Sequence, residues 1–298
     1  MRARRRRDAH AIYLIPGFFG FTNLGRFRYF MHVDRFLRGR GEIVHLIGHS
    51  TGGVDARLLV APGVVLPTKL DVDRWAGRVR SVIGVSSPQH GTPLAAYLTT
   101  RRGQRTLALL SLTTSYVLRE VFEDQSLLLQ LTLESMDLFA ATVRDRPGVR
   151  YGSVVTRSRP PGVGSALAAG LDAGAQAIHA IYGAIYRLTA QSRAAETPQP
   201  DAAQRRALRR AYGKVPGAHA NDGIVPTRAQ VHGQVIAAVR GDHLDVIGHF
   251  NDPAADPPHF DWLTTGSGFD RARFEAVWDG VLGFLLAERR QRSGRPST

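Results

Sequence analysis

The sequence predicts an α/β fold with a mostly parallel central sheet, and two observations carry this prediction. Short apolar segments, typical of buried strands, alternate along the chain with longer segments of helical periodicity. The chain has 298 residues, of which 43% are hydrophobic and 21% charged, which is ordinary for a globular protein and enough for one large domain. The composition therefore excludes a collagen-like chain and a wholly disordered one.

Five apolar segments are predicted to be buried strands. The first ends at Pro16 and Gly17, residue types that stop a strand and begin a turn. The five segments comprise residues 11–15, 43–47, 79–85, 149–156 and 235–240. Because helical segments connect them, we expect most neighbouring strands to be parallel.

Helices are predicted between these strands and at the end of the chain. Residues 24–37 place apolar side chains at helical spacing, and residues 52–59 begin a second helix after a glycine-rich turn. The last helix covers about residues 269–289 and is amphipathic. Its predicted buried face consists of Phe274, Val277, Val281, Phe284 and Leu285. The polar stretch 193–204, which contains two prolines, is predicted to be an exposed loop.

We expect a single domain from residue 11 to residue 290. It is flanked by a basic, disordered N-terminus of residues 1–10 and by a disordered tail of residues 291–298. Two helical insertions, at about residues 105–145 and 160–215, interrupt the alternation of strands and helices. We expect these apolar insertions to form a cap over a pocket.

A candidate nucleophile lies between the second predicted strand and the helix that follows it. Residues 48–52 read Gly-His-Ser-Thr-Gly and match the pattern G-x-S-x-G, with Ser50 at its centre. A strand–turn–helix context of this kind is the setting of a nucleophile elbow, whose sharp turn requires small residues on both sides. The helix N-terminus beyond Ser50 presents free N–H groups to developing negative charge. The alternative interpretation is an ordinary glycine-rich turn with a spare serine.

A serine nucleophile requires a base and an acid that orients the base. On sheets of this kind they follow the serine in the order acid, then histidine. Asp222 and His243 lie in predicted loops at the carboxyl ends of strands, where open α/β sheets place their sites. An Asx-turn aspartate and a surface histidine are the alternative interpretations. The rival acids and bases, less well placed, are Asp242, Asp245, His219, His232 and His249.

Two backbone N–H groups are predicted to form an oxyanion hole. Gly17 allows the chain to turn after the first strand so that the N–H of Phe18 points inward, and Thr51 supplies the second donor. The aromatic residues Phe19 and Phe21 follow in the same loop and are candidates for substrate contact. The alternative for this loop is a plain β-turn.

These segments together resemble bacterial lipases and esterases of the α/β-hydrolase superfamily, nearest to the triacylglycerol lipases. The resemblance spans most of the chain and depends on PGFFG at 16–20, HLIGHSTGG at 45–53, VIGVSSPQHGTPLA at 82–95, NDGIVP at 221–226 and DHLD at 242–245. It implies an α/β-hydrolase fold with helical cap insertions. It also implies Ser50 as nucleophile, Asp222 as acid and His243 as base, with Phe18 and Thr51 as oxyanion donors. We interpret His49 and His90 as packing residues of the elbow and of a loop.

The sequence departs from the family pattern in three places. The oxyanion loop has Pro16 where the family usually has histidine. Asp245 stands where some secreted relatives have one ligand of a structural calcium ion, but His249 replaces the expected amide side chain, so we predict no metal and no cofactor. Residues 20–42 hold one convincing helix, so one strand–helix unit is missing before the nucleophile strand. The strand at residues 11–15 would then be an exposed edge, and we expect reduced stability or a partner chain that covers it.

These features predict a serine hydrolase that cleaves carboxylic esters, preferably of lipids, through an acyl-enzyme. Acyl transfer to an alcohol by the same triad is an alternative that the sequence does not separate from hydrolysis. A second alternative is a catalytically impaired relative that binds a lipid or a partner, which the missing strand–helix unit supports.

Net charge favours an anionic surface as a partner. The chain carries 39 Lys+Arg against 25 Asp+Glu, a formal charge of +14, so we expect peripheral contact with anionic membranes. No recognised nucleic-acid module accompanies the charge, and we expect no nucleic-acid partner. The N-terminal arginines are not followed by a signal-peptide pattern, and no apolar stretch reaches 18 residues, so a cytoplasmic location is expected. The chain has no cysteine, which excludes disulfides and a thiol nucleophile, and its oligomeric state stays open.

Overall fold

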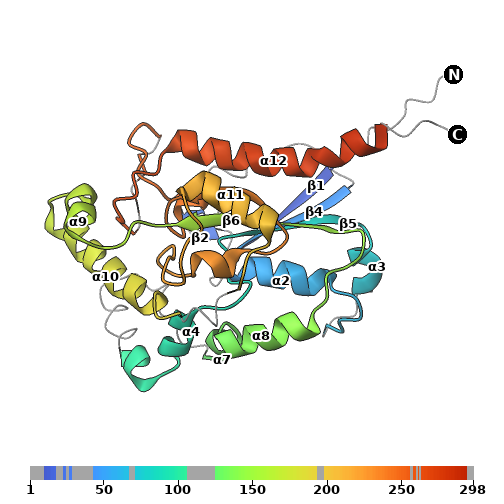
Figure 1. Cartoon of the computed structure of the whole chain (residues 1–298), viewed down its shortest axis with the longest axis horizontal. Coiled ribbons are helices and arrows are strands. Elements are labelled where there is room, and N and C mark those ends of the chain that lie inside the picture. The colour runs from blue at the N-terminus through green and yellow to red at the C-terminus, as the bar shows by residue number, and fades with distance from the viewer. Residues whose placement is uncertain are drawn as a thin grey trace, which may run out of the picture.

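A five-stranded sheet with helices on both faces forms the centre of the computed structural model (Figure 1). The structure describes residues 10–17, 23–24, 27–28, 43–66, 71–105, 125–192, 198–255, 258–259, 261 and 263–293. The strands are β1 (His10–Ile15), β4 (Ile43–His49), β5 (Val79–Val85), β6 (Arg150–Arg157) and β7 (Gln234–Arg240). Their order is β1-β4-β5-β6-β7, and each neighbouring pair is parallel. The predicted α/β class with a parallel sheet is therefore confirmed.

β1 lies at one end of this order and pairs with β4. The paired residues run from His10 opposite Ile43 to Ile15 opposite Gly48. Among the described strands it has this single neighbour, as expected for a sheet that lacks a strand beside it. Tyr13 on β1 is half exposed. The chain thus passes from β1 to β4 in the central sheet without another described strand of that sheet between them.

The helix predicted for residues 24–37 is wrong at its beginning. Asn23–Leu24 (β2) and Phe27–Arg28 (β3) form a short antiparallel pair, with Leu24 opposite Phe27. Two residues, one of them Gly25, connect the pair in the sequence, and a two-residue connection with glycine favours a hairpin over a helix. The remainder of that predicted helix lies outside the described residues.

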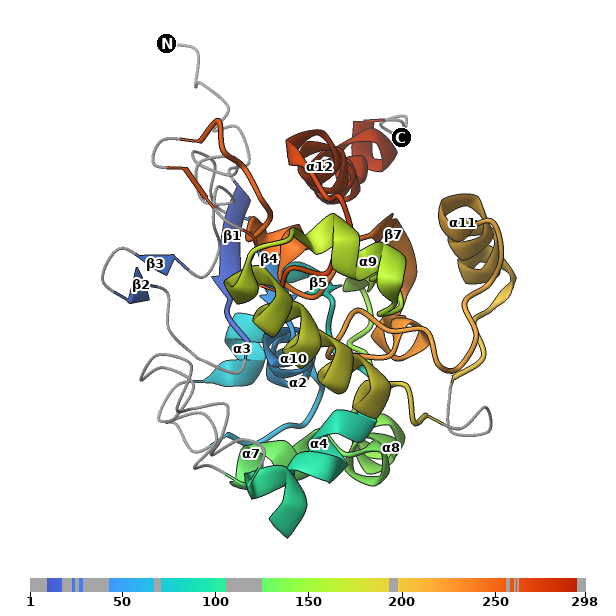
Figure 2. The ribbon, with the colours of Figure 1, turned by 90° about the vertical axis from the view of Figure 1, so that its left-hand side faces the viewer.

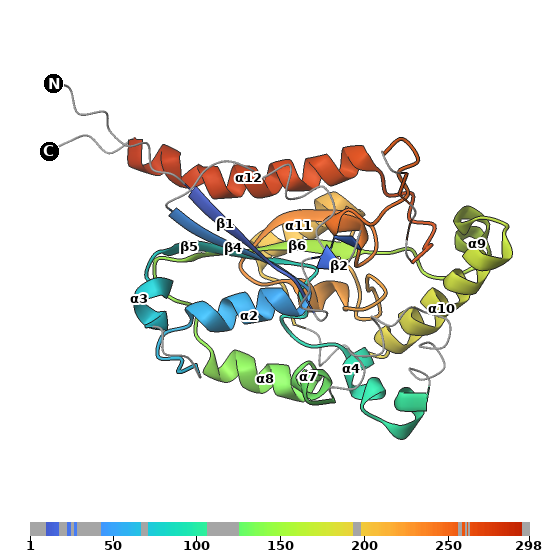
Figure 3. The same ribbon diagram turned by 180° about the vertical axis from the view of Figure 1, so that it is seen from behind.

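Helices cover the two faces of the sheet and the loops at its end. They are α2 (Thr51–Val60), α3 (Val72–Ala76), α4 (Pro93–Leu98), α7 (Gln125–Gln130), α8 (Leu133–Thr142), α9 (Val163–Ala169), α10 (Ala173–Thr189), α11 (Ala202–Tyr212) and α12 (Arg271–Ser293), with short 3-10 turns at Thr227–Gln230 and Asp245–Ile247. α2 and α3 pack on one face of β4 and β5, and α12 packs on the other face (Figures 1 and 3). The predicted buried face of the last helix is confirmed, because all five of its residues are buried, together with Trp278.

α11 packs against β6 and β7 on the face opposite to α12. Val154 belongs to the cluster that includes α12, whereas its neighbour Val155 contacts the cluster around Leu208 of α11. The predicted loop 193–204 is wrong at its C-terminal end, because residues 202–204 form the first turn of α11. Asp201 and Gln204 form a capping box, which begins a helix despite the polar sequence. Residues 193–197 lie outside the described part.

α9 and α10 lie beyond the carboxyl ends of the strands (Figure 1). Figure 2, which views the molecule from that end, has α10 in front of the sheet. No helix in the described ranges is long and apolar enough to span a bilayer.

Candidate active site

Ser50 occupies the turn that joins β4 to α2. Its backbone has φ 54° and ψ −130°, a conformation that L-residues rarely adopt and that stores strain. The Ser50 N–H donates to the carbonyl of Val85 at 2.9 Å, which fixes the turn against the neighbouring strand. The side chain is largely buried. This is the strand–serine–helix arrangement that the sequence predicts for a nucleophile.

The glycines on both sides of Ser50 permit this turn. A Cβ atom at Gly48 would lie closer than 3.0 Å to the carbonyl oxygen of Gly52, which real Cβ atoms essentially never do. A Cβ atom at Gly52 would come equally close to the carbonyl oxygens of Ile15 and Pro16. The first turn of α2 therefore rests directly on the end of β1.

This close approach brings Thr51 near the beginning of the predicted oxyanion loop. Thr51 is buried and is the first residue of α2, so its N–H has no acceptor within the helix. Gly17 is also buried. Phe18, Phe19 and Phe21 lie outside the described residues, so their roles stay predictions.

His243 and Asp222 form a buried pair at the same edge of the sheet. The Nδ1 atom of His243 lies 2.9 Å from Oδ2 of Asp222, and the His243 backbone N–H donates to the Asp222 carbonyl at 3.1 Å. Asp222 is fully buried and His243 is 3% exposed. Since Nδ1 is held by the carboxylate, Nε2 is the ring nitrogen that is left for a proton transfer.

Four further donors surround the carboxylate of Asp222. Oδ1 accepts from the N–H groups of Ile224 and Val225 at 2.9 and 2.7 Å. Oδ2 accepts from the hydroxyl of Thr156 at 2.8 Å and from the amide of Gln230 at 3.1 Å. Hydrogen bonds to a charged acceptor are strong, and together they stabilise the anion in a buried place. Thr156 and Gln230 were not recognisable from the sequence, because no local pattern marks them.

His49 links the Ser50 turn to the loop of His243. Its Nε2–H donates to the His243 carbonyl at 2.8 Å, and the two rings are 4.6 Å apart between centroids. Burial, together with the nearby His243 ring, lowers the pKa of His49 well below its usual value, so the ring is neutral. The structure thus adds a hydrogen bond between the two loops to the packing role predicted for His49. Within the described residues the hydroxyl of Ser50 makes no hydrogen bond to His243, and such catalytic contacts are often long without substrate.

The rival acids and bases have other partners. Oδ1 of Asp242 accepts from the backbone N–H of Leu244 and of Asp245, so it caps its own turn instead of reaching the ring of His243. The rival histidines contact other groups: His219 the carbonyl of Ala190, His232 the carboxylate of Asp145, and His249 the ring of His259. The geometry therefore favours Asp222 and His243 as the acid–base pair.

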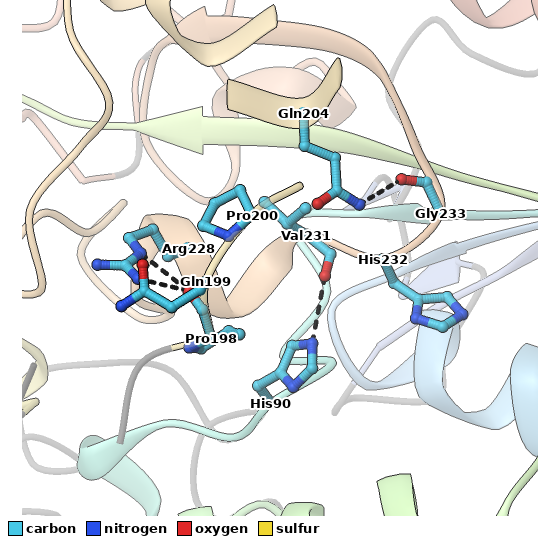
Figure 4. A pocket seen from close by; sticks show the side chains of 9 residues that line it. All are labelled: His90, Pro198, Gln199, Pro200, Gln204, Arg228, Val231, His232 and Gly233. Carbon is cyan, nitrogen blue, oxygen red and sulfur yellow. Dashed lines mark hydrogen bonds between the residues drawn. The ribbon is translucent and has the colours of Figure 1, made fainter. Parts of the chain in front are cut away.

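A polar cavity of about 200 Å³ lies elsewhere in the molecule. His90, residues 198–200, Gln204, Arg228 and residues 231–233 line it, and none of Ser50, Asp222 and His243 does (Figure 4). The Nε2 atom of His90 contacts the Val231 carbonyl at 3.3 Å, and burial lowers the pKa of His90 to about 4. The imidazole of His90 is neutral, and the guanidinium of Arg228 donates to the Pro198 carbonyl. We therefore assign no catalytic role to the residues of this cavity.

Comparison with known proteins gives similarity at the level of solved structures. No model of a known protein family and no curated protein sequence matches the chain. It is similar to a metagenomic carboxyl esterase, with 18% identity and a TM-score of 0.49 over 83% of this chain and 57% of that chain. It is also similar to Staphylococcus hyicus lipase, with 14% identity and a TM-score of 0.48 over 85% of this chain and 72% of that chain. A third similar structure is EstA from Clostridium botulinum, with 18% identity and a TM-score of 0.42 over 76% of this chain and 64% of that chain. The chain therefore spans little more than half the length of that metagenomic esterase.

Proposed function

We propose that this chain is a serine hydrolase that cleaves carboxylic esters, with lipid esters as its substrates. The observation that carries the proposal is the meeting of the strained Ser50 turn with the buried His243–Asp222 pair, which His49 joins. A serine in this backbone conformation, next to a histidine whose Nδ1 is held by a carboxylate, is the arrangement that acyl transfer requires.

In this mechanism the Nε2 atom of His243 takes the proton of Ser50 while the Ser50 oxygen attacks the ester carbonyl. Asp222 keeps the proton on Nδ1 and stabilises the imidazolium that forms. The Thr51 N–H, together with the predicted Phe18 N–H, donates to the oxyanion. His243 then protonates the leaving alcohol, and water activated by the same nitrogen releases the acid from Ser50.

The surface of the predicted cap segment at residues 160–215 supports lipid as the substrate class. Val163 and Leu167 of α9 and Leu171, which follows α9, are 80%, 62% and 83% exposed. Exposed apolar side chains of this kind, on a chain of net charge +14, suit contact with an anionic lipid surface. We propose that the α9 end of the cap contacts the membrane. Vesicles with and without anionic lipid test this, and equal activity and binding with both would contradict it.

The nucleophile is tested by hydrolysis of p-nitrophenyl esters of increasing acyl length and by labelling with a fluorophosphonate. We expect Ser50→Ala to lose at least a thousandfold in kcat and all labelling, while its melting temperature stays near that of the wild type. Ser87→Ala is the matched control, because Ser87 is a buried serine on the neighbouring loop that bonds to Gln89.

The outcomes separate the proposal from its alternatives. Label on another residue, or full activity of Ser50→Ala, would refute the role of Ser50. A well-folded wild type that hydrolyses no ester would favour the binding relative over the enzyme. Transfer of the acyl group to added alcohols in preference to water would replace hydrolysis by acyl transfer.

A further inference from the structure

Ser86 lies at the carboxyl end of β5, between the turn of Ser50 and the carboxylate of Asp222. It follows Val85, the last residue of β5, whose carbonyl accepts from the Ser50 N–H at 2.9 Å. On its other side, the Ser86 N–H donates to the carbonyl of Val154 in β6 at 3.0 Å. The serine is fully buried, so its hydroxyl requires a partner inside the protein.

The backbone of Ser86 adopts a conformation that disfavours serine. Its φ is 48°, in the left-handed region where glycine is the usual residue. Among the described residues other than glycine, only Ser50 and Thr264 share a positive φ. Strain of this kind persists where the surroundings hold it, and it is concentrated at functional sites. The hydroxyl that this backbone carries is therefore a candidate for a role at the neighbouring site.

The hydroxyl of Ser86 forms a hydrogen bond with the hydroxyl of Thr156, with 2.8 Å between the two oxygens. The Thr156 oxygen in turn lies 2.8 Å from Oδ2 of Asp222 and 3.1 Å from Oε1 of Gln230. All four residues are fully buried. Two hydroxyl groups and a carboxylate thus form a continuous chain of hydrogen bonds away from water.

The number of protons decides the direction of this chain. Each hydroxyl has one proton to donate. If Thr156 donated to Ser86, the carboxylate of Asp222 would lose a donor, and the Ser86 proton would have no acceptor in the described part of the chain. The order that satisfies every group is the opposite one: Ser86 donates to Thr156, and Thr156 donates to Asp222.

This order fixes the position of the Thr156 proton. The hydrogen bond from Ser86 occupies one lone pair of the Thr156 oxygen and leaves the Thr156 proton for Asp222. It also polarises the Thr156 hydroxyl, because hydrogen bonds in a chain strengthen one another where water is excluded. Oδ2 of Asp222, which receives this proton, lies 2.9 Å from Nδ1 of His243, so the chain ends at the histidine.

We propose that Ser86 is a positioning residue for the His243–Asp222 pair: its hydroxyl, acting through Thr156, keeps the carboxylate in the orientation that serves the histidine. This role rests on the proposed hydrolase function, since positioning has an effect only on a working pair. In the described part of the chain the Ser86 side chain makes no hydrogen bond to Ser50 or His243. Its effect on turnover therefore passes through Thr156.

The test is a double-mutant cycle of Ser86→Ala and Thr156→Val, measured by hydrolysis of p-nitrophenyl esters. We expect Ser86→Ala to lower kcat about threefold to tenfold, which corresponds to one neutral hydrogen bond, and to leave KM unchanged. In the Thr156→Val background the same change should alter kcat by less than about twofold, since the connection is already cut. Ser87→Ala is the matched control and should keep the wild-type kcat, because the Ser87 hydroxyl accepts from the Gln89 amide and does not join the chain.

Two measurements separate positioning from a loss of structure. Ser86→Gly removes the hydroxyl but suits the positive φ, so it should lose as much kcat as Ser86→Ala and be at least as stable in urea denaturation. The resonance of the proton between Nδ1 of His243 and Asp222 can be followed by proton NMR without substrate. It should move in Ser86→Ala and in Thr156→Val but stay in place in Ser87→Ala.

The outcomes distinguish the role of Ser86 from the proposed function. An active wild type whose kcat and NMR resonance are unchanged by Ser86→Ala overturns the role and leaves the hydrolase in place, whereas a wild type without esterase activity overturns the hydrolase and the role with it. Equal losses of kcat in the wild-type and Thr156→Val backgrounds also overturn the role, because Ser86 would then act by another route. A loss in Ser86→Ala that Ser86→Gly does not share would assign the effect to backbone strain instead of the hydroxyl.

Discussion

Thr156→Val removes one hydroxyl donor from the carboxylate of Asp222 and leaves the size of the side chain nearly unchanged. The hydroxyl lies 2.8 Å from Oδ2 of Asp222, and both residues are fully buried. A hydrogen bond to a charged group contributes about 1.5–3 kcal/mol, and a buried methyl group offers no replacement. We therefore expect a loss of about 2 kcal/mol in the free energy of unfolding. We also expect a fall of roughly tenfold to thirtyfold in kcat/KM, because the carboxylate that orients His243 is held less firmly.

Thr227→Val is the control for this experiment. Its hydroxyl donates to the backbone carbonyl of Thr156 at 3.1 Å, and the residue is equally buried, but it does not touch the carboxylate. We expect it to lose about 1 kcal/mol of stability and little activity. Urea denaturation gives the stabilities, and ester hydrolysis is measured where both variants are fully folded. Equal losses of kcat/KM in the two variants, or no loss in Thr156→Val, would refute the assigned role of Asp222.

Three further predictions concern the elbow, acid stability and the support of α2. Gly52→Ala places a Cβ closer than 3.0 Å to two carbonyl oxygens at the end of β1, so it should lower the free energy of unfolding, measured by urea denaturation, by about 3 kcal/mol or more. Gly217→Ala is the control, because a Cβ there would have nothing within 4 Å, and equal losses in the two variants would contradict the packing argument. Burial lowers the pKa of His90 to about 4, so the free energy of unfolding falls as the pH falls from 6.5 towards 4, because the unfolded chain takes up the proton first. His90→Gln should remove up to about 3 kcal/mol of this fall, and parallel curves of unfolding free energy against pH for the variant and the wild type would argue against it. Arg57→Met removes the hydrogen bonds of a buried guanidinium to Asp145 and to the Val143 carbonyl, and should lower the free energy of unfolding by about 2 kcal/mol. An unchanged free energy of unfolding would mean that water stabilises the Arg57–Asp145 pair as well as the protein does.

The strands were predictable because their sequence signal is local. Residues 79–85 coincide with β5, since a buried strand of a parallel sheet is continuously apolar and ends at turn residues. The same rule ends β4 too early, at residue 47. The ladder continues through Gly48 opposite Gly84 and His49 opposite Val85, and a backbone ladder does not require apolar side chains.

Two errors arose where a short local signal outweighed the character of the longer segment around it. β2 and β3 occupy the beginning of a segment with helical apolar spacing, because the pairing of a two-residue hairpin is decided by its connection. α11 begins inside a polar stretch because the side chain of Asp201 accepts from the N–H groups of Ala203 and Gln204. The hydrogen bonds of the N-cap thus begin α11 inside a stretch that was predicted to be a loop.

The candidate site divides in the same way between local and distant signals. Ser50 and its glycines form a contiguous motif, and Asp222 and His243 follow strands, so all three could be proposed from sequence. The donors Thr156 and Gln230 lie far apart in the sequence and meet only at the carboxylate of Asp222. Asp261 likewise comes near Asp242 and Asp245 only through the fold, because it lies well beyond them in the sequence, within the same connection between β7 and α12.

Position in the fold, and not distance along the chain, determines which acid contacts the ring of His243. Asp242 is adjacent to His243 in the sequence, yet its carboxylate faces two other acids, and burial raises its pKa well above the usual range. Asp222 lies 2.9 Å from the ring and is held by two backbone N–H groups, a hydroxyl and an amide. A buried carboxylate can remain an anion only where such donors, or a cation, replace the lost water. Hydrogen-bond donors therefore stabilise the anion of Asp222, whereas burial beside Asp245 and Asp261 raises the pKa of Asp242 and favours its protonated form.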